Sequence, residues 1–315
     1  MCEFTQQLRP LTTKRGVFCI AAAGSLVWAY WPYLADMGSR WIGDPEYSHG
    51  PLVILFAAWL LRSRRGVLRQ IVSDSRLGFC LLLVAIGLRA VGTLLFLNYL
   101  DGLSFLVALL AVFGFAAGRP GVRWAGPAVA FLAFMLPLPF AVQTGMSEAL
   151  QGVATRASTY VLVTCGSPAV AEGNTILLIN DVRLGVVEAC SGLGMLYAFL
   201  AIAVGTILVI RSRPLWIKVT LILSTPIVAV AVNVCRIATT GLLYQAAEDR
   251  IARIVFHDVA GYLMMPAALA IFALEVVILD RLVRTVTIPR GAVAAVAFGL
   301  RPAPPTAAGV TPAPR

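Results

Sequence analysis

The sequence predicts an all-α polytopic membrane protein, and its composition and its apolar stretches are the two observations behind this prediction. Of the 315 residues, 59% are hydrophobic and only 13% are charged, which is about half the charged share of a typical soluble domain. Several apolar stretches reach the roughly 20 residues that a helix needs to cross a bilayer. An ordinary soluble domain is therefore excluded.

The apolar runs and their charged flanks predict eight membrane spans, of which the second is short. They cover residues 17–35, 50–61, 77–97, 102–118, 122–142, 191–210, 215–240 and 258–280. We expect one membrane domain of about eight transmembrane helices over residues 1–290. The Ala- and Pro-rich segment 291–315 has a composition typical of a disordered tail.

The formal net charge of +10 follows from membrane topology. If the N-terminus is cytoplasmic, most arginines and lysines fall in inner segments, and the outer side keeps only Arg40, Arg156, Arg183, Arg250 and Arg253. This asymmetry matches the positive-inside rule and predicts that both termini face the cytoplasm. The excess of positive charge therefore requires no nucleic-acid partner.

The fifth and sixth spans enclose one large outer loop, residues 143–189. Its first half mixes polar and apolar residues in a way that favours an amphipathic helix at the outer surface. Further on, the runs "TILLI" and "VRLGVVEA" flank the dipeptide "ND", a pattern that predicts a short β-hairpin. Cys190 then lies between this hairpin and the sixth span.

Three polar side chains are expected at one depth near the outer boundary of the membrane. Arg236 lies twenty residues beyond Trp216, about 30 Å along a helix that starts at the cytoplasmic face. Cys190 begins the sixth span and His257 precedes the eighth. Consecutive helices are usually neighbours, and an ionisable residue inside a span is a functional candidate. We therefore expect these three residues to share a site.

The combination of thiol, imidazole and guanidinium suits nucleophilic catalysis. Positive charge and the start of a helix would favour the thiolate of Cys190, and His257 could act as general base and acid. Arg236 could stabilise the thiolate, an oxyanion or a substrate carboxylate. Gly192 and Gly194 are expected to leave room for a substrate backbone. The candidate substrate-binding or supporting residues are Glu188, Ser191, Gly192, Asn233, Asp258, His49 and Arg89, and Thr240 shares a helix stripe with Asn233 and Arg236.

The segments around these residues resemble the exosortase/archaeosortase family of membrane cysteine transpeptidases. The resemblance rests on "ACSGL" at 189–193, "NVCRI" at 233–237 and "HDVAG" at 257–261, with "DPEYSHGPLV" at 44–53 as a fourth element. It implies that Cys190, Arg236 and His257 are catalytic. It also implies a bacterial inner-membrane enzyme, with its active site on the periplasmic side, that acts on exported proteins through a thioester acyl-enzyme. Such partner proteins end in a Pro-Glu-Pro-like motif, a transmembrane helix and a basic cluster, and an acceptor then receives the acyl group.

Several alternatives remain open at this stage. Cys190 could form a disulfide with Cys165, and Arg236 could extend to the outer headgroups. His49 could orient the site or merely cap the second span, and Arg89 could pair with a polar group in the bundle or with a substrate. A transporter or polysaccharide-export component that uses the two intramembrane arginines is the competing class of function. We expect no metal or cofactor, because the two histidines and the carboxylates have no metal-ligand spacing.

Overall fold

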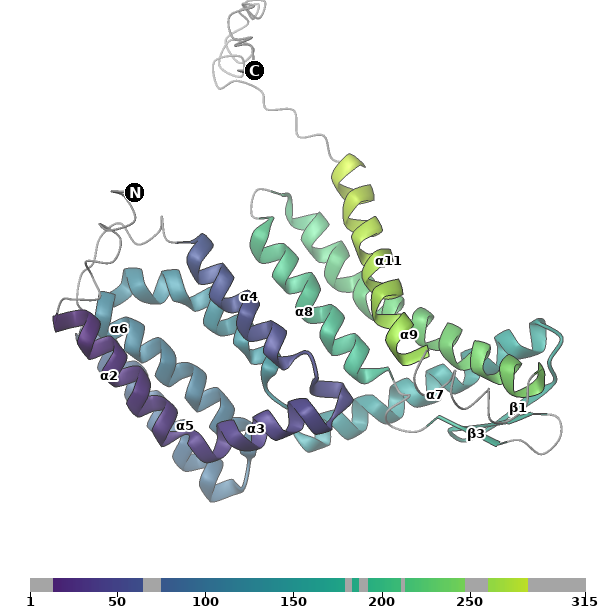
Figure 1. Cartoon of the computed structure of the whole chain (residues 1–315), viewed down its shortest axis with the longest axis horizontal. Coiled ribbons are helices and arrows are strands. Elements are labelled where there is room, and N and C mark those ends of the chain that lie inside the picture. Colours follow the sequence, from purple (N-terminus) through teal and green to yellow (C-terminus); the bar gives the residue numbers. More distant parts are fainter. Residues whose placement is uncertain are drawn as a thin grey trace, which may run out of the picture. The chain divides into compact units, whose positions relative to one another are not determined.

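The computed structural model of the chain is almost entirely helical, with one small sheet (Figure 1). It describes residues 14–64, 75–178, 183–186, 192–210, 213–246 and 260–282. The chain divides into a large unit, Met1–Phe272, and a small one, Ala273–Arg315. In the small unit the described residues are the end of the last helix, and every other described element belongs to the large unit.

The helices follow the order that the apolar runs predict, with additional breaks. Their bounds are α2 Lys14–Ala29, α3 Trp31–Gly43, α4 Gly50–Ser63, α5 Ser75–Leu95, α6 Asn98–Phe131, α7 Phe140–Thr164, α8 Leu193–Val209, α9 Leu215–Ala246 and α11 Ala260–Leu282. Two short 3₁₀ helices, η2 (Pro45–Tyr47) and η4 (Leu132–Met135), connect α3 to α4 and α6 to α7.

Within the described residues, three stretches are long and apolar enough to cross a membrane, namely Arg76–Leu95, Asn98–Met135 and Leu215–Tyr244. Shorter apolar helices cover Ile20–Ala29, Gly50–Ser63, Leu193–Val209 and Leu269–Leu279. The chain is therefore a multi-pass membrane protein. The number of eight spans stays a prediction.

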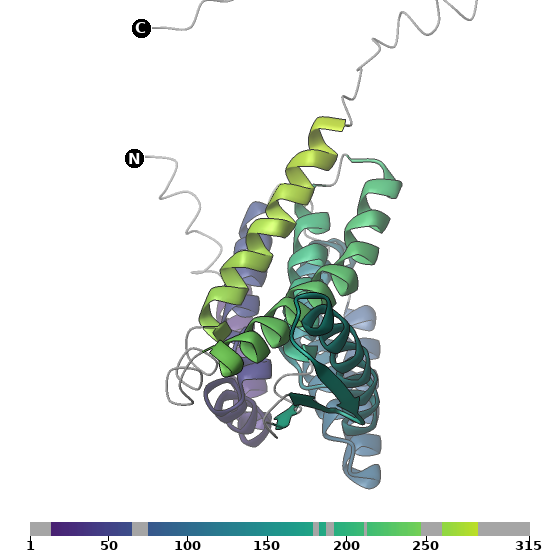
Figure 2. The ribbon, with the colours of Figure 1, turned by 90° about the vertical axis from the view of Figure 1, so that its right-hand side faces the viewer.

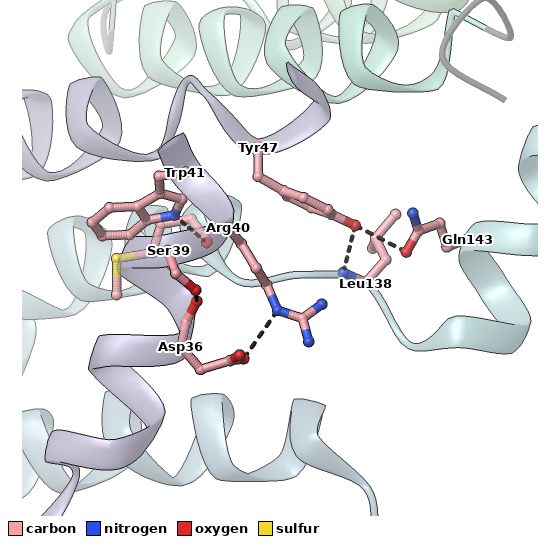
Figure 3. Close-up of polar contacts among 8 residues, drawn as sticks. Asp36, Ser39, Arg40, Trp41, Tyr47, Leu138 and Gln143 are labelled. Atoms are coloured by element: carbon pink, nitrogen blue, oxygen red, sulfur yellow. Dashed lines mark hydrogen bonds and ion pairs between the residues drawn. The ribbon is translucent and has the colours of Figure 1, made fainter. Parts of the chain in front are cut away.

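The first predicted span, residues 17–35, does not continue as one helix. α2 ends at Ala29, Tyr30 leaves helical geometry at φ −104° and ψ 12°, and α3 starts with a proline in its first turn. Proline lacks the N–H that would continue the helical hydrogen bonds. α3 is amphipathic, and its exposed Asp36 and Arg40 form an ion pair at 3.0 Å (Figure 3).

The fourth and fifth predicted spans correspond to the two halves of α6, which reverses direction at Gly118. Gly118 has φ 63° and ψ −147°, a backbone geometry that only glycine adopts readily. A Cβ on Gly121 would lie 2.5 Å from the carbonyl oxygen of Phe113, so the two halves fold closely together. The fifth span ends earlier than expected, because η4 and an extended segment with prolines at 137 and 139 precede α7.

The predicted outer loop contains the expected helix and hairpin, with a third strand. β1 (Ala169–Glu172), β2 (Thr175–Leu178) and β3 (Arg183–Gly185) form an antiparallel sheet in that order beside α7 (Figure 2). Ile176 pairs with Leu184 across the predicted hairpin. β1 is an additional strand, joined to β2 by a two-residue turn in which Gly173 has φ 59°.

The polarity of α7 is inverted relative to a helix of a soluble protein. Its hydroxyl-bearing residues Ser147, Thr155 and Ser158 are buried, while Val153 and Tyr160 are exposed. The buried face packs against α9, where Ser158 Oγ donates a hydrogen bond of 3.4 Å to the carbonyl oxygen of Val234. The apolar side of the sheet packs on the same two helices. This packing fixes the position of α9.

We predict that Gly114→Val destabilises the α5–α6 pair, because a Cβ at this position would lie 3.1 Å from the Cα of Gly78. Overpacking of this kind costs about 1–3 kcal/mol, so the apparent unfolding temperature of the detergent-purified protein should fall. Gly87→Val on α5 is the matched control, since nothing lies within 4 Å of a Cβ there. Equal effects of the two substitutions would contradict the prediction.

Candidate functional site

The site predicted from the sequence falls partly outside the described residues. Cys190 and His257, with Glu188, Ser191 and Asp258, lie in segments that the structure does not describe. Gly192, Asn233, Arg236 and Thr240 are described. The structure therefore reports on the surroundings of the predicted nucleophile and on the helix that carries the predicted arginine.

The first turn of α8 packs directly against α9. Gly192 is the N-cap residue of α8, with φ 82° and ψ 6°, in the left-handed region that favours glycine. A Cβ on Gly192 would lie 3.1 Å from Nδ2 of Asn233, whose side chain is 1% exposed. The "ACSGL" segment therefore meets the "NVCRI" segment through a contact that a larger residue would obstruct.

A second glycine brings a third segment to the same turn. A Cβ on Gly194 would lie 2.9 Å from the Cα of Glu46, and η2 packs against α8. The "DPEYSHG" segment thus lies beside the start of α8. The space next to both glycines is occupied by Asn233 and Glu46, so it is not the room for a substrate backbone that the sequence suggested.

A chain of hydrogen bonds orients Glu46. Gln143 of α7 donates from Nε2 to Oε2 of Glu46 at 3.0 Å and accepts at Oε1 from the hydroxyl of Tyr47 at 3.2 Å. The Tyr47 hydroxyl also accepts from the backbone N–H of Leu138 at 3.3 Å (Figure 3). Burial raises the pKa of Tyr47, so the hydroxyl keeps the proton that it donates. Glu46 is thereby held beside the first turn of α8, where the helix dipole favours negative charge.

The sequence alone indicated no role for Glu46, Tyr47 or Gln143, although the first two lie in the segment "DPEYSHGPLV". The polar residues of "DPEYSHG" ahead of an apolar helix were an available signal for the first two. No sequence signal links Gln143 to residues almost a hundred positions earlier, because only the folded chain brings them together.

His49, two residues after Tyr47, is also buried. Its Nε2 donates to the carbonyl oxygen of Phe134 at 3.1 Å, since a carbonyl can only accept. Its ring meets the ring of Tyr197 edge-on at 5.6 Å. The residue is the N-cap of α4, but its side chain makes no capping hydrogen bond. The imidazole therefore links η4 to α4 and α8 and does not act as a side-chain cap of α4.

Arg236 lies in α9 between two buried polar residues, Asn233 and Thr240. Its Nε and Nη2 atoms are buried and have no hydrogen-bond partner in the part of the chain that the structure describes. Buried donors without acceptors carry a desolvation cost, and burial of two guanidinium nitrogens argues against simple extension to the headgroups. Two buried donors of this kind suit the binding of an anion.

Two other predicted candidates lie elsewhere. Arg89 of α5 donates from Nη2 to the carbonyl oxygen of Ala29 at 2.9 Å and stacks on the ring of Tyr30, so it pairs with groups of the bundle at the end of α2. Cys165 is an exposed free thiol, and the disulfide considered for it involves Cys190, which lies outside the described residues.

Comparison with known proteins gives one match. A family model described as transmembrane exosortase matches residues 41–274, a range that includes all four segments quoted above. No match was found among curated proteins or among solved structures.

We predict that His49 makes stability depend on pH. Burial holds the pKa of His49 below its usual value, so the unfolded chain binds the proton at a higher pH than the folded chain. This contribution to stability is complete above about pH 6.5 and is lost as the pH falls through the folded pKa. The apparent unfolding temperature should therefore fall between about pH 7.5 and 5.5, and His49→Gln should reduce that fall. His257→Gln is the control, and an unchanged pH dependence in His49→Gln would contradict the assignment.

Proposed function

We propose, because the chain belongs to the transmembrane exosortase family, that it is a membrane cysteine peptidase and transpeptidase that processes exported proteins. The observation that carries the proposal is the contact between Gly192 and Asn233. Cys190 is two residues before the glycine and Arg236 is three residues after the asparagine. The contact therefore supports a common location for the proposed nucleophile and the buried guanidinium.

In the proposed reaction, the Cys190 thiolate attacks the carbonyl carbon of the scissile peptide bond. The resulting tetrahedral oxyanion collapses to a thioester, the C–N bond breaks, and His257 donates a proton to the leaving amine. An acceptor nucleophile then attacks the thioester carbonyl and releases the thiolate. The start of α8 would stabilise the thiolate of Cys190, because the N–H groups at a helix start favour negative charge.

Arg236 is the proposed anion receptor of this reaction. Its buried Nε and Nη2 donors suit either the oxyanion or a glutamate carboxylate of the substrate motif. Donors that are already desolvated and fixed stabilise a developing charge more than donors in water do. Asn233 and Thr240 would hold the helix surface around it.

The proposed substrates are membrane-anchored proteins with a C-terminal Pro-Glu-Pro-like motif, a transmembrane helix and a basic cluster. The basic cluster would remain on the cytoplasmic side of the inner membrane, with both termini of the enzyme. The length of the substrate helix would then present the scissile bond to Cys190 at the outer face. This geometry accounts for an enzyme whose predicted catalytic residues lie near the ends of spans.

Replacement of the proposed nucleophile is the direct test. Cys190→Ala and Cys190→Ser should abolish cleavage of a membrane-anchored substrate with a sorting signal, measured by its change in mass, because neither forms the thioester. Cys165→Ala is the matched control, since Cys165 is a free, exposed thiol of the same predicted outer loop. Full cleavage by Cys190→Ala would exclude the mechanism. If this variant instead lost a solute flux, the result would favour a transporter.

Arg236→Gln should lower the rate of acyl-enzyme formation by roughly 100-fold or more, as loss of an oxyanion donor does in other enzymes. Acyl-enzyme trapped at Cys190 and quantified by mass spectrometry reports this step. Arg156→Gln on the exposed side of α7 removes an arginine on the same predicted side of the membrane and should have little effect. A wild-type rate in Arg236→Gln would remove the residue from the reaction.

A further inference from the structure

A groove in the first half of the bundle has no part in the proposed reaction. It lies between α2, α5 and α6 and has a volume of about 420 Å³, within the range of small-molecule sites. Its walls are apolar, and they are formed by Leu26, Leu82, Ala85, Ile86 and Ala108. Arg89, Tyr30 and Thr93 form its polar end.

The positive charge of Arg89 is not neutralised by the protein around it. One N–H bonds to the carbonyl oxygen of Ala29 at 2.9 Å, and the guanidinium carbon lies 4.3 Å from the centre of the Tyr30 ring. In the part of the chain that the structure describes, no carboxylate lies within ion-pair distance of Arg89. A guanidinium has five N–H donors, and among the described residues only the bond to Ala29 uses one of them. An unpaired charge within a span is costly, and an anion in the groove would remove that cost.

The polar and apolar ends of the groove lie at different depths. Arg89 precedes the end of α5 at Leu95 by six residues, about 9 Å along the axis. Thr93 is one turn nearer to that end, whereas Leu82 is seven residues deeper than Arg89, about 10 Å. In the predicted topology α5 ends at the outer face. The charge therefore lies about 9 Å inside the outer end of the span, and the apolar slot extends from there towards the membrane centre.

We infer that this groove binds one anionic lipid of the outer leaflet, with its phosphate on Arg89 and one hydrocarbon chain along the slot. The order of charge and apolar surface with depth is that of a lipid. A peptide helix is about 10 Å across, so 420 Å³ would hold only about one turn of it. The ligand class is a phosphate ester with a long hydrocarbon chain, and the site is separate from the proposed reaction centre.

The test is native mass spectrometry of the full-length protein released from detergent with added phosphatidylglycerol. Wild-type protein should retain one lipid that Arg89→Gln holds roughly tenfold more weakly, the effect of losing one charge-assisted contact. Ile86→Trp should also lose the lipid, because Ile86 lines the slot and leaves Arg89 intact. Leu83→Trp is the matched control, since Leu83 is exposed on the same helix without lining the groove.

Competitors distinguish the sources of the phosphate. Dodecyl phosphate should displace the lipid, whereas inorganic phosphate, which lacks the chain, should not. Equal retention by wild type, Arg89→Gln and Ile86→Trp would overturn the inference. Displacement by inorganic phosphate as efficient as by dodecyl phosphate, or by a hydrophobic helical peptide alone, would also overturn it.

Discussion

The close approach of the first turn of α8 to its neighbours is the constraint on which the rest of the site depends. Two positions without a Cβ, Gly192 and Gly194, meet Asn233 on one side and Glu46 on the other. A Cβ at position 194 would force the backbone at Glu46 to shift, and one at position 192 would press on the Asn233 side chain, which a close-packed interior resists. Three segments that are distant in the sequence therefore meet at one helix start.

Polar contacts hold this arrangement where apolar packing alone would permit sliding. The 3₁₀ helix η4 is fixed from several directions: Trp41 Nε1 donates to the carbonyl oxygen of Met135 at 3.4 Å (Figure 3), and Tyr197 donates to that of Ala133 at 3.2 Å. Together with the contacts of Tyr47 and His49, these bonds satisfy backbone groups of η4 and of the proline-containing segment that follows it. Buried polar groups are costly unless they are paired, so the network specifies one geometry.

The sequence was sufficient for the family, the membrane character and the main elements of the outer loop, because each has a local signal. The apolar runs predicted the helices, and "ND" between two β-favouring runs predicted a hairpin. The pairing of Ile176 with Leu184 confirms that hairpin. The break at Tyr30 was missed, since the apolar composition continues through it and hides the effect of the following proline. β1 was missed because four residues of mixed polarity give no periodicity. The role of Gln143 depends on a contact with Glu46 across 97 positions, which no local pattern encodes.

The two arginines inside the membrane-spanning region illustrate why location decides the meaning of a charge. Arg89 borders a lipid-sized groove and contacts a carbonyl and an aromatic ring, which are both uncharged, so the anion inferred to complement it belongs to the membrane. Arg236 has two buried nitrogens without partners among the described residues, beside a polar stripe on α9. A charge that is desolvated and unpaired at rest is stabilised when a negative charge enters or develops next to it. These buried nitrogens of Arg236 therefore support its proposed role, which is to bind the oxyanion that forms when a thiolate attacks a peptide carbonyl.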